Sequence, residues 1–269
     1  MKAAAFAYAK PRSLAEALDL LERPGAKILA GGQSLIPSLN MRLSAPELLV
    51  DIGAIASLGG MELNGSTVRI GALTTHAQIE KSTLVRRHVP MLADAAAQIA
   101  HPAVRNRGTL GGSLALADPA AEYPACALAL DATLVIHGKK GERRTKATEF
   151  FKGLFETDLK PDEILTGAEF PTGGESSFDE LARRQGDYAS AGLAAHRRDS
   201  EIRLAFFGVA SKAILAKHAA AEAKKSIAAA QQALAQDLDP PADLYHSGAT
   251  KLHLARVLLG RALARWNMK

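Results

Sequence analysis

The chain has 269 residues, of which 48% are hydrophobic, and this length and composition are typical of a globular protein with one large or two moderate domains. Lys and Arg exceed Asp and Glu by 33 to 28, but the charges are dispersed, so nothing in them requires a nucleic acid partner. Cys126 is the single cysteine, which excludes an internal disulfide and any iron–sulfur cluster held by this chain, because a cluster needs about four thiolates.

The N-terminal segment predicts a compact β-α-β unit. Ser13 and Glu16 have the spacing of a capping box, so we expect a helix that begins there and ends at Pro24-Gly25. Apolar strands are expected over residues 27–30 and 47–52. Connections that contain a helix normally join parallel strands, so these strands should be parallel.

The N-terminus does not have the features of a leader peptide. Residues 7–9 have the small-residue pattern of a signal cleavage site, but no adequate apolar stretch precedes them. No window approaches the roughly 20 apolar residues of a membrane span. We therefore expect a cytoplasmic chain with no membrane span.

A glycine loop follows the first predicted strand directly. Gly31, Gly32 and Ser34 stand just after the apolar run, where a strand would end. Glycine tolerates positive φ and close approach of other groups, and a hydroxyl can bind a ligand in such a bend. Taken alone, this composition is also that of an ordinary tight turn.

From about residue 56 the pattern changes to a predicted hairpin, with Asn64-Gly65 as its turn and residues 67–71 as a strand. Residues 75–78 should cap a helix, and Pro90 and Pro124 should each open another. Strands are predicted over 133–137 and 163–170, and residues 139–146 should form a charged turn that either docks a partner or is a solvated hairpin tip.

The segment 101–124 holds a second glycine-rich loop. Successive free amides and hydroxyls can form a concavity that binds a phosphate group. The residues of this kind are Gly108, Thr109, Gly111, Gly112 and Ser113, with Arg105 and Arg107 adding positive charge beside them. Two such loops, far apart in the sequence, could enclose the two phosphates of one dinucleotide from either side.

Residues 171–177 have the composition of a linker or long turn, so a domain boundary is expected there. Strands are predicted over 189–195 and 202–209, and a long alanine-rich helix over 213–236. The final helix should span residues 250–266, with Arg256, Arg261 and Arg265 facing solvent or a partner.

With its two glycine loops, the sequence resembles the FAD-binding medium subunit of molybdenum-containing hydroxylases, the family of aerobic carbon monoxide dehydrogenase and xanthine dehydrogenase. The segments that carry the resemblance are residues 30–35, 105–113, 183–189 and the final helix, so it spans nearly the whole chain. It implies an α+β protein with a two-subdomain FAD-binding fold of the vanillyl-alcohol-oxidase/PCMH type over residues 1–171, divided at about residue 55. A smaller C-terminal α+β domain of antiparallel sheet and helices would follow over residues 172–269.

The resemblance also implies which residues contact FAD. These are Leu29, Ala30, Gly31, Gly32, Gln33, Ser34, Leu35, Thr109, Gly111, Gly112, Ser113, Glu122, Leu165 and Tyr188. We expect no catalytic residue and no metal ligand on this chain, because the flavin carries its own redox chemistry and the eight histidines are scattered without metal-ligand spacing.

Several of these positions have a second interpretation. Glu122 stands where relatives usually have an aspartate, and it is also a carboxylate that the dipole favours at a helix N-terminus. Leu165 fits a core leucine better than a flavin contact, and Tyr188, which could cover one face of the flavin, is equally a half-buried tyrosine of a sheet. Many relatives have a lysine shortly before the double arginine, where this sequence has Asp179 and Glu180, so the redox tuning of the flavin stays open.

The implied function is electron transfer within a larger enzyme. A large partner subunit would oxidise the substrate at a molybdenum cofactor, a small partner would hold [2Fe–2S] clusters, and FAD on this chain would pass electrons to an external acceptor. The assembly expected is a dimer of heterotrimers. Two alternatives stay open: a self-sufficient flavin oxidase, and an assembly protein that keeps the fold without flavin. Neither the substrate nor the acceptor follows from the sequence.

Overall fold

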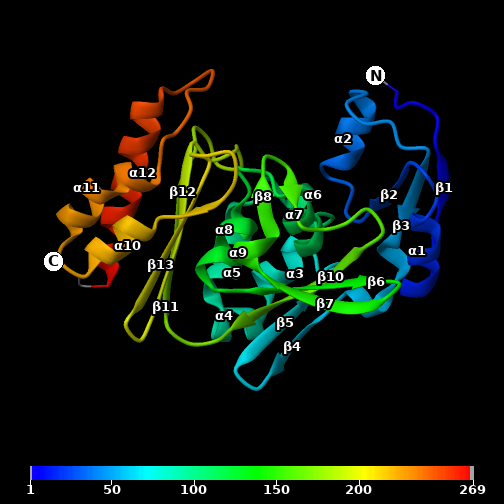
Figure 1. The fold of residues 1–269 in the computed structure, drawn as a ribbon, viewed down its shortest axis with the longest axis horizontal. Coiled ribbons are helices and arrows are strands. Elements are labelled where there is room, and N and C mark those ends of the chain that lie inside the picture. Colours follow the sequence, from blue (N-terminus) through cyan, green and yellow to red (C-terminus); the bar gives the residue numbers. More distant parts are fainter. Residues whose placement is uncertain (1, 267–269) are drawn as a thin grey trace.

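A small parallel sheet in the N-terminal part of the chain forms one end of the molecule (Figure 1). The structure, a computed structural model, describes residues 2–266. The strand order is β1-β3-β2 with both pairs parallel, as expected from the helix-bearing connections. Helix α1 buries Ala17, Leu18 and Leu21 in the same cluster as Val50 of the central strand. The elements are β1 (Ala7–Ala9), α1 (Leu14–Leu21), β2 (Ala26–Leu29), α2 (Leu35–Asn40) and β3 (Leu48–Asp51), followed by 3-10 turns at Ile52–Ala54 and Ala56–Leu58.

The middle of the molecule is an antiparallel five-stranded sheet of order β4-β5-β10-β6-β7. Strand β5 and the paired part of β10 alternate apolar and polar residues. Val68 and Ala168 face a buried core, whereas Arg69 and Glu169 point to the opposite face. The strands are β4 (Met61–Asn64), β5 (Thr67–Gly71), β6 (Thr133–Gly138), β7 (Gly141–Lys146) and β10 (Ile164–Pro171).

Helices cover the apolar face of this sheet and fill the centre of the molecule (Figure 1). Helix α8 is buried along almost its whole length, which explains its content of Ala and Cys rather than larger polar residues. The elements are α3 (His76–Lys81), α4 (Thr83–His88), α5 (Pro90–Gln98), α6 (Pro102–Arg105), α7 (Leu110–Leu116), α8 (Glu122–Ala129) and α9 (Ala147–Phe150), with the short ribbon β8 (Phe151–Gly153) and β9 (Glu156–Thr157).

The C-terminal part is an antiparallel sheet of order β11-β12-β13-β14 packed between two sets of helices. Leu193 and Phe206 face α10 to α12, whereas Ala194 and Phe207 face the core of the middle part. The sheet therefore has no solvated face along these strands. The elements are β11 (Glu175–Leu181), β12 (Ala191–Arg198), β13 (Glu201–Phe207), β14 (Ile214–Leu215), α10 (Lys217–Ala223), α11 (Ile227–Asp237) and α12 (Gly248–Arg265).

Four expectations about elements were wrong. Residues 141–146 of the expected charged turn are strand β7, and Lys139 at the true turn pairs with Asp19 of α1 and with Glu22, the C-cap of that helix. Helix α8 begins at Glu122 rather than at Pro124. The expected helix over 213–236 is two helices, preceded by the short strand β14. Strand β11 already begins at Glu175, inside the expected linker.

Two further features agree with the sequence. Thr75 and Gln78 form a complete capping box at α3. Cys126 is fully buried, and burial raises the pKa of its thiol well above the usual value, so it behaves as a small core residue. Among residues 2–266, no helix has both the length and the apolar character that a membrane span requires.

Candidate functional site

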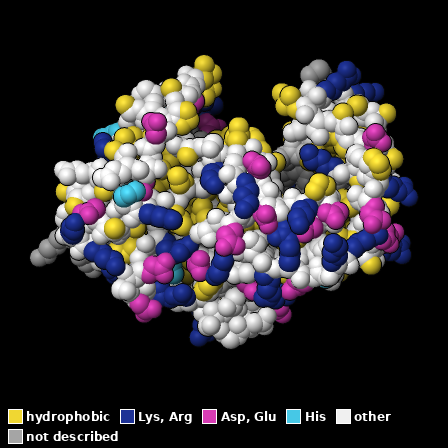
Figure 2. Space-filling model, viewed as in Figure 1, with side chains coloured by type: hydrophobic (Ala, Val, Ile, Leu, Met, Phe, Trp, Pro, Cys, Tyr) yellow, Lys and Arg dark blue, Asp and Glu magenta, His cyan; other side chains and the backbone are white. Residues whose placement is uncertain are grey.

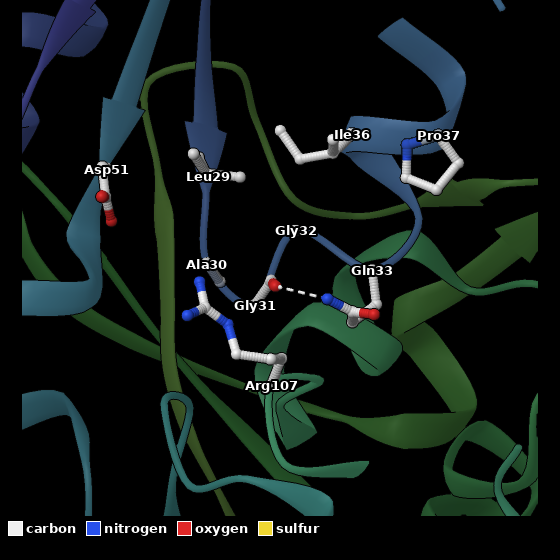
Figure 3. Close-up of a pocket in the computed structure, with 9 residues that line it drawn as sticks. All are labelled: Leu29, Ala30, Gly31, Gly32, Gln33, Ile36, Pro37, Asp51 and Arg107. Atoms are coloured by element: carbon white, nitrogen blue, oxygen red, sulfur yellow. Dashed lines mark hydrogen bonds between the residues drawn. The ribbon is translucent and has the colours of Figure 1, made fainter. Parts of the chain in front are cut away.

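A pocket opens where the first glycine loop leaves strand β2 (Figure 3). Its volume is about 390 Å³. The carboxyl ends of parallel strands meet at one edge of a sheet, so Leu29 of β2 and Asp51 of β3 both border it. The lining residues are Leu29, Ala30, Gly31, Gly32, Gln33, Ile36, Pro37, Asp51 and Arg107.

The backbone amides of the first loop are available to a ligand. Within residues 2–266, none of the five consecutive amides from Gly31 to Leu35 donates a hydrogen bond to the protein. Gly32 has a φ of +75°, the left-handed region that favours glycine and turns the chain at this point. Ser34 precedes α2 without capping it through its side chain, and within the described part of the chain its hydroxyl has no hydrogen-bond partner. Such a run of amides is suited to an anion.

The two glycine loops lie against each other. A Cβ atom added to Gly31 would stand 2.2 Å from the carbonyl oxygen of Arg107 and 2.9 Å from the Cα of Gly108. Gly31 is therefore required for the contact between the loops. The two segments, more than seventy residues apart in the sequence, form one border of the same pocket (Figure 3).

The second glycine segment is not the open loop of free amides that we expected. Thr109 is the N-cap of α7, and its hydroxyl accepts the amide of Gly112. The amides of Leu110 and Gly111 donate to the carbonyls of Thr74 and Ala72, and that of Ser113 donates to Thr109. The anion-binding character of the site therefore lies in the first loop.

The paired glycines of the second segment differ in their surroundings. A Cβ on Gly111 would stand 2.5 Å from the Cβ of Ala72, so this glycine allows α7 to pack closely against the segment that follows β5. A Cβ on Gly112 would meet only the Thr109 hydroxyl, at 3.0 Å, and Gly112 is exposed. Only the second glycine is therefore open to a ligand.

The two arginines of this segment also differ. Arg105 pairs with Glu80 at 2.9 Å and donates to the carbonyls of Ile99 and Ala100, so its charge is used within the fold. Arg107 extends its guanidinium past Ala30 into the pocket (Figure 3). Among residues 2–266, no carboxylate pairs with Arg107. It supplies the positive charge of the pocket.

Glu122 and Tyr188 lie near one another, away from the pocket lining. Glu122 is the first residue of α8, which is the helix-terminal position we considered for it. Burial raises its pKa to about 8, with the charges of Glu180 and Asp118 adding to the effect. Partial desolvation raises the pKa of Tyr188, and the charges of Asp118 and Glu122 raise it further. These groups therefore gather at the N-terminal end of α8.

Tyr188 and Leu165 have opposite exposures. The Tyr188 side chain is 74% exposed and stands in the loop before β12, so it is not a half-buried sheet tyrosine. Leu165 is 4% exposed and packs within the core on β10. A flavin contact at Leu165 stays a prediction that depends on the resemblance alone.

The two acidic residues at the expected lysine position face opposite sides of β11. Asp179 lies 3.3 Å from Arg265 and 3.6 Å from Arg261 of α12, so these arginines, whose side chains are half exposed to solvent, also pair within the chain. Glu180 is on the same side as Phe178, toward the middle part of the molecule. Its Oε2 atom is buried without a hydrogen-bond partner within residues 2–266, and burial followed by the charge of Asp179 raises its pKa to about 7.

This arrangement fits a large phosphorylated cofactor. Five unpaired amides and one arginine can hold a pyrophosphate, and the open side of Gly112 leaves room beside α7. Within the described residues, no group of three or more His, Cys, Asp or Glu could hold a metal ion. Ile36, Pro37 and Asp51 were missed as lining residues. Asp51 could have been found, because it ends the strand parallel to the one that carries the loop.

Comparison with known proteins gives a consistent result over the whole chain. Residues 4–173 match the family described as FAD binding domain in molybdopterin dehydrogenase, and residues 176–266 match the CO dehydrogenase flavoprotein C-terminal domain. The chain is 39% identical to the 6-hydroxypseudooxynicotine dehydrogenase complex subunit alpha of Paenarthrobacter nicotinovorans, covering 98% of this chain and 95% of that protein.

The same likeness extends to carbon monoxide dehydrogenase of Hydrogenophaga pseudoflava. Its medium chain is 36% identical, with 97% of each chain covered. A solved structure of that enzyme, lacking the Mo-pyranopterin moiety of the molybdenum cofactor, superposes with a TM-score of 0.95 at 37% identity and covers 98% of each chain.

Proposed function

The chain belongs to the FAD-binding medium subunits of molybdenum hydroxylases, the family of carbon monoxide dehydrogenase and xanthine dehydrogenase, and from this membership we propose its place in electron transfer. It is a subunit of a dehydrogenase complex. We propose that it holds FAD between [2Fe–2S] clusters on a small partner subunit and an external acceptor. The flavin supplies the chemistry, since it can exchange electrons with one-electron and two-electron partners.

The run of unpaired amides from Gly31 to Leu35 carries this proposal. These amides would bind the pyrophosphate, with the guanidinium of Arg107 as counter-charge. Thr109, Gly112 and Ser113 would border the same ligand from α7, while Glu122 and Tyr188 would lie toward the flavin end. The protein's task is to bind and orient, because none of these groups has to perform a chemical step.

Partner subunits follow from the same proposal. A large subunit would carry the molybdenum cofactor and the substrate site, in a dimer of heterotrimers within the cytoplasm. The lone buried Cys126 requires any iron–sulfur cluster to be on another chain. We also propose that residues 1–171 and 172–269 are the functional domains, with FAD in the first.

The alternatives are less well supported by the geometry. A self-sufficient oxidase needs a substrate site of its own, whereas both faces of the C-terminal sheet are used in packing. A flavin-free assembly protein would leave without a ligand the five amides and the Arg107 guanidinium, which have no protein partner within residues 2–266.

The proposal is tested by producing the chain together with the products of its neighbouring genes and purifying it under native conditions. We expect flavin, iron and molybdenum to elute with it in one complex. The chain alone should bind FAD but should not be reduced by organic substrates. A colourless protein that gains no flavin absorbance on incubation with FAD, or a lone chain that a substrate reduces, would contradict the proposal.

A further inference from the structure

The loop that carries Tyr188 has little structure of its own. It joins β11 to β12 over residues 182–190, and its backbone hydrogen bonds are those from Asp187 to Arg184 and from Ser190 to Leu181. Gly186, with a φ of +82°, packs against Ala100 and His101 on one side. Since the Tyr188 side chain is 74% exposed, its position depends on how the rest of the loop is held.

A second contact holds the other side of this loop. The guanidinium carbon of Arg183 lies 3.7 Å from the centre of the Tyr245 ring, which is cation–π geometry. Among residues 2–266, no carboxylate pairs with Arg183. Arg183 thus contacts the face of the Tyr245 ring and not the carboxylate of Asp187, which lies in the same loop.

Tyr245 is itself firmly placed. The Oδ1 atom of Asp243 accepts the amides of Tyr245 and His246, each at 2.8 Å. Lys251, whose side chain is 8% exposed, reaches the Oδ2 atom of Asp243 at 2.7 Å and also donates to the carbonyl of Gly208. These contacts hold the pKa of Asp243 well below its usual range, with the bond from Lys251 as the largest cause. The segment before α12 is therefore a rigid support.

The support continues into the middle part of the molecule. Gly208, which accepts from Lys251, donates its amide to the carbonyl of Pro119 at 2.8 Å. Pro119 lies between Asp118 and Glu122, the two carboxyl groups near Tyr188. The support for the Tyr188 loop and the segment that leads into α8 are thus connected through Gly208.

We propose that Tyr245 is a positioning residue, which holds the 182–190 loop through its stacking with Arg183 and so keeps Tyr188 at the flavin site. The inference rests on the proposed function, which places Tyr188 toward the flavin. The aromatic face is the part that acts, so phenylalanine should replace tyrosine and leucine should not. The neighbouring Leu244 is 87% exposed and provides a matched control that lacks this contact.

The test uses the full chain and four proteins: wild type, Tyr245→Leu, Tyr245→Phe and Leu244→Ala. The first measurement is tryptic cleavage after the exposed Arg184 in protein without added FAD. We expect cleavage to be about 2- to 5-fold faster in Tyr245→Leu, the population change that loss of an exposed cation–π contact produces, and unchanged in the other two variants. Equal cleavage of Tyr245→Leu and wild type would overturn the proposal.

The second measurement is titration with FAD, followed by the quenching of flavin fluorescence. Weaker binding by a similar factor in Tyr245→Leu, with wild-type binding in Tyr245→Phe, supports the positioning role. Faster cleavage with unchanged FAD affinity and unchanged quenching overturns it. Equal urea midpoints for the four proteins would exclude a general loss of stability. If wild type itself bound no FAD, the proposed function would fail, and this is a separate outcome of the same titration.

Discussion

Adjacent glycines at the start of α7 differ in what they allow. Gly111 lets α7 approach Ala72, while Gly112 presents an open side. A sequence pattern treats the two as a pair, because both lack a Cβ. The contacts separate a glycine needed for folding from one that leaves room for a ligand.

We predict that Gly112→Val abolishes FAD binding and leaves a folded chain. The branched side chain would occupy the space beside α7, while its Cβ displaces only the Thr109 hydroxyl by a small distance. Absorbance at flavin wavelengths after incubation with FAD measures binding, and circular dichroism reports the fold. Gly111→Val is the matched contrast and should not fold. Retained yellow colour in Gly112→Val would show that the open side does not face the cofactor.

Arg107 is predicted to be the cation that matters for the cofactor. Replacing it in Arg107→Gln removes a charge-assisted contact with a phosphate group, so FAD affinity should fall by about 10- to 100-fold with little change in stability. Equilibrium titration measures the affinity. Arg87→Gln on α4, an exposed arginine outside the pocket, should bind FAD as wild type does. A similar loss in both variants would indicate a general charge effect.

Glu180 is predicted to make stability depend on pH. Its pKa in the folded protein is about 7 against 4.5 in the unfolded chain, because burial disfavours its charge. The folded state therefore keeps a proton that the unfolded state loses, and stability falls as pH rises from about 4.5 to 7. Since Glu180 is half-buried, we expect Glu180→Gln to gain up to about 2 kcal/mol at pH 8 and little at pH 4. Urea unfolding at both pH values is the measurement, and an equal gain at both would contradict the assignment.

At the scale of elements, the sequence predicted those that have strong local signals. The capping box at Thr75, the turn at Asn64-Gly65 and the first-turn Pro90 each satisfy backbone geometry within a few residues. Strand β1 was missed because it has only three residues, which are largely exposed, and because alanine is uncommon in strands. Strand β7 was missed because its charged side chains pair with neighbours: Arg143 with Glu163 and Asp158, Arg144 with Glu169.

The residues of the candidate site divide in the same way, into those with a local sequence signal and those whose role depends on distant residues. The first loop could be recognised because its glycines and hydroxyl follow a strand directly. The sequence could not show that the amides of the second segment are already bonded, because they donate to Ala72 and Thr74, more than thirty residues earlier. Which of Arg105 and Arg107 is free was likewise decided by a distant residue, Glu80.

The break between α10 and α11 shows how one residue divides an alanine-rich helix. Ser226 has an extended backbone, with φ of −166°, and its hydroxyl accepts the amide of Ala229 as an N-cap. We predict that Ser226→Ala lowers the free energy of unfolding by about 1 kcal/mol, as loss of a cap does. Ser226→Asp keeps the cap and should be nearly neutral. Urea unfolding is the measurement, FAD affinity should not change, and equal losses in both variants would exclude the cap as the cause.

At the scale of the whole molecule, the two family-matched regions share one core. The cluster around α5 and α8 includes Ala194, Ala205 and Phe207 of the C-terminal sheet. Arg203 donates from Nε and Nη2 to the carbonyl of Leu128 near the end of α8. The sequence did not predict this contact, because strands with alanine on both faces show no clear apolar side.

The space-filling view shows a hollow beside the N-terminal lobe (Figure 2). The molecule is hollowed between its N-terminal lobe and the middle part, and basic and acidic side chains are interspersed over this face (Figure 2). The hollow separates the lobe that carries β2 and β3 from the helices of the centre (Figures 1 and 2). Binding of FAD against both the first loop and α7 would join these two parts, as the shared core already joins the middle and C-terminal parts.

The core shared by the middle and C-terminal parts predicts how the protein unfolds. Trp266 is the single tryptophan and is buried among α10 to α12, so its fluorescence reports the C-terminal part. Under the proposed binding mode, release of FAD would report the first loop and α7. Because one core spans the middle and C-terminal parts, we expect tryptophan exposure to coincide with the loss of helical circular dichroism in a single urea transition. Added FAD should shift both signals together to higher urea, since a ligand of the native state stabilises everything that unfolds with it. Two separate transitions, with Trp266 unaffected by FAD, would show that the C-terminal part folds independently and that the shared core is too weak to couple it to the cofactor site.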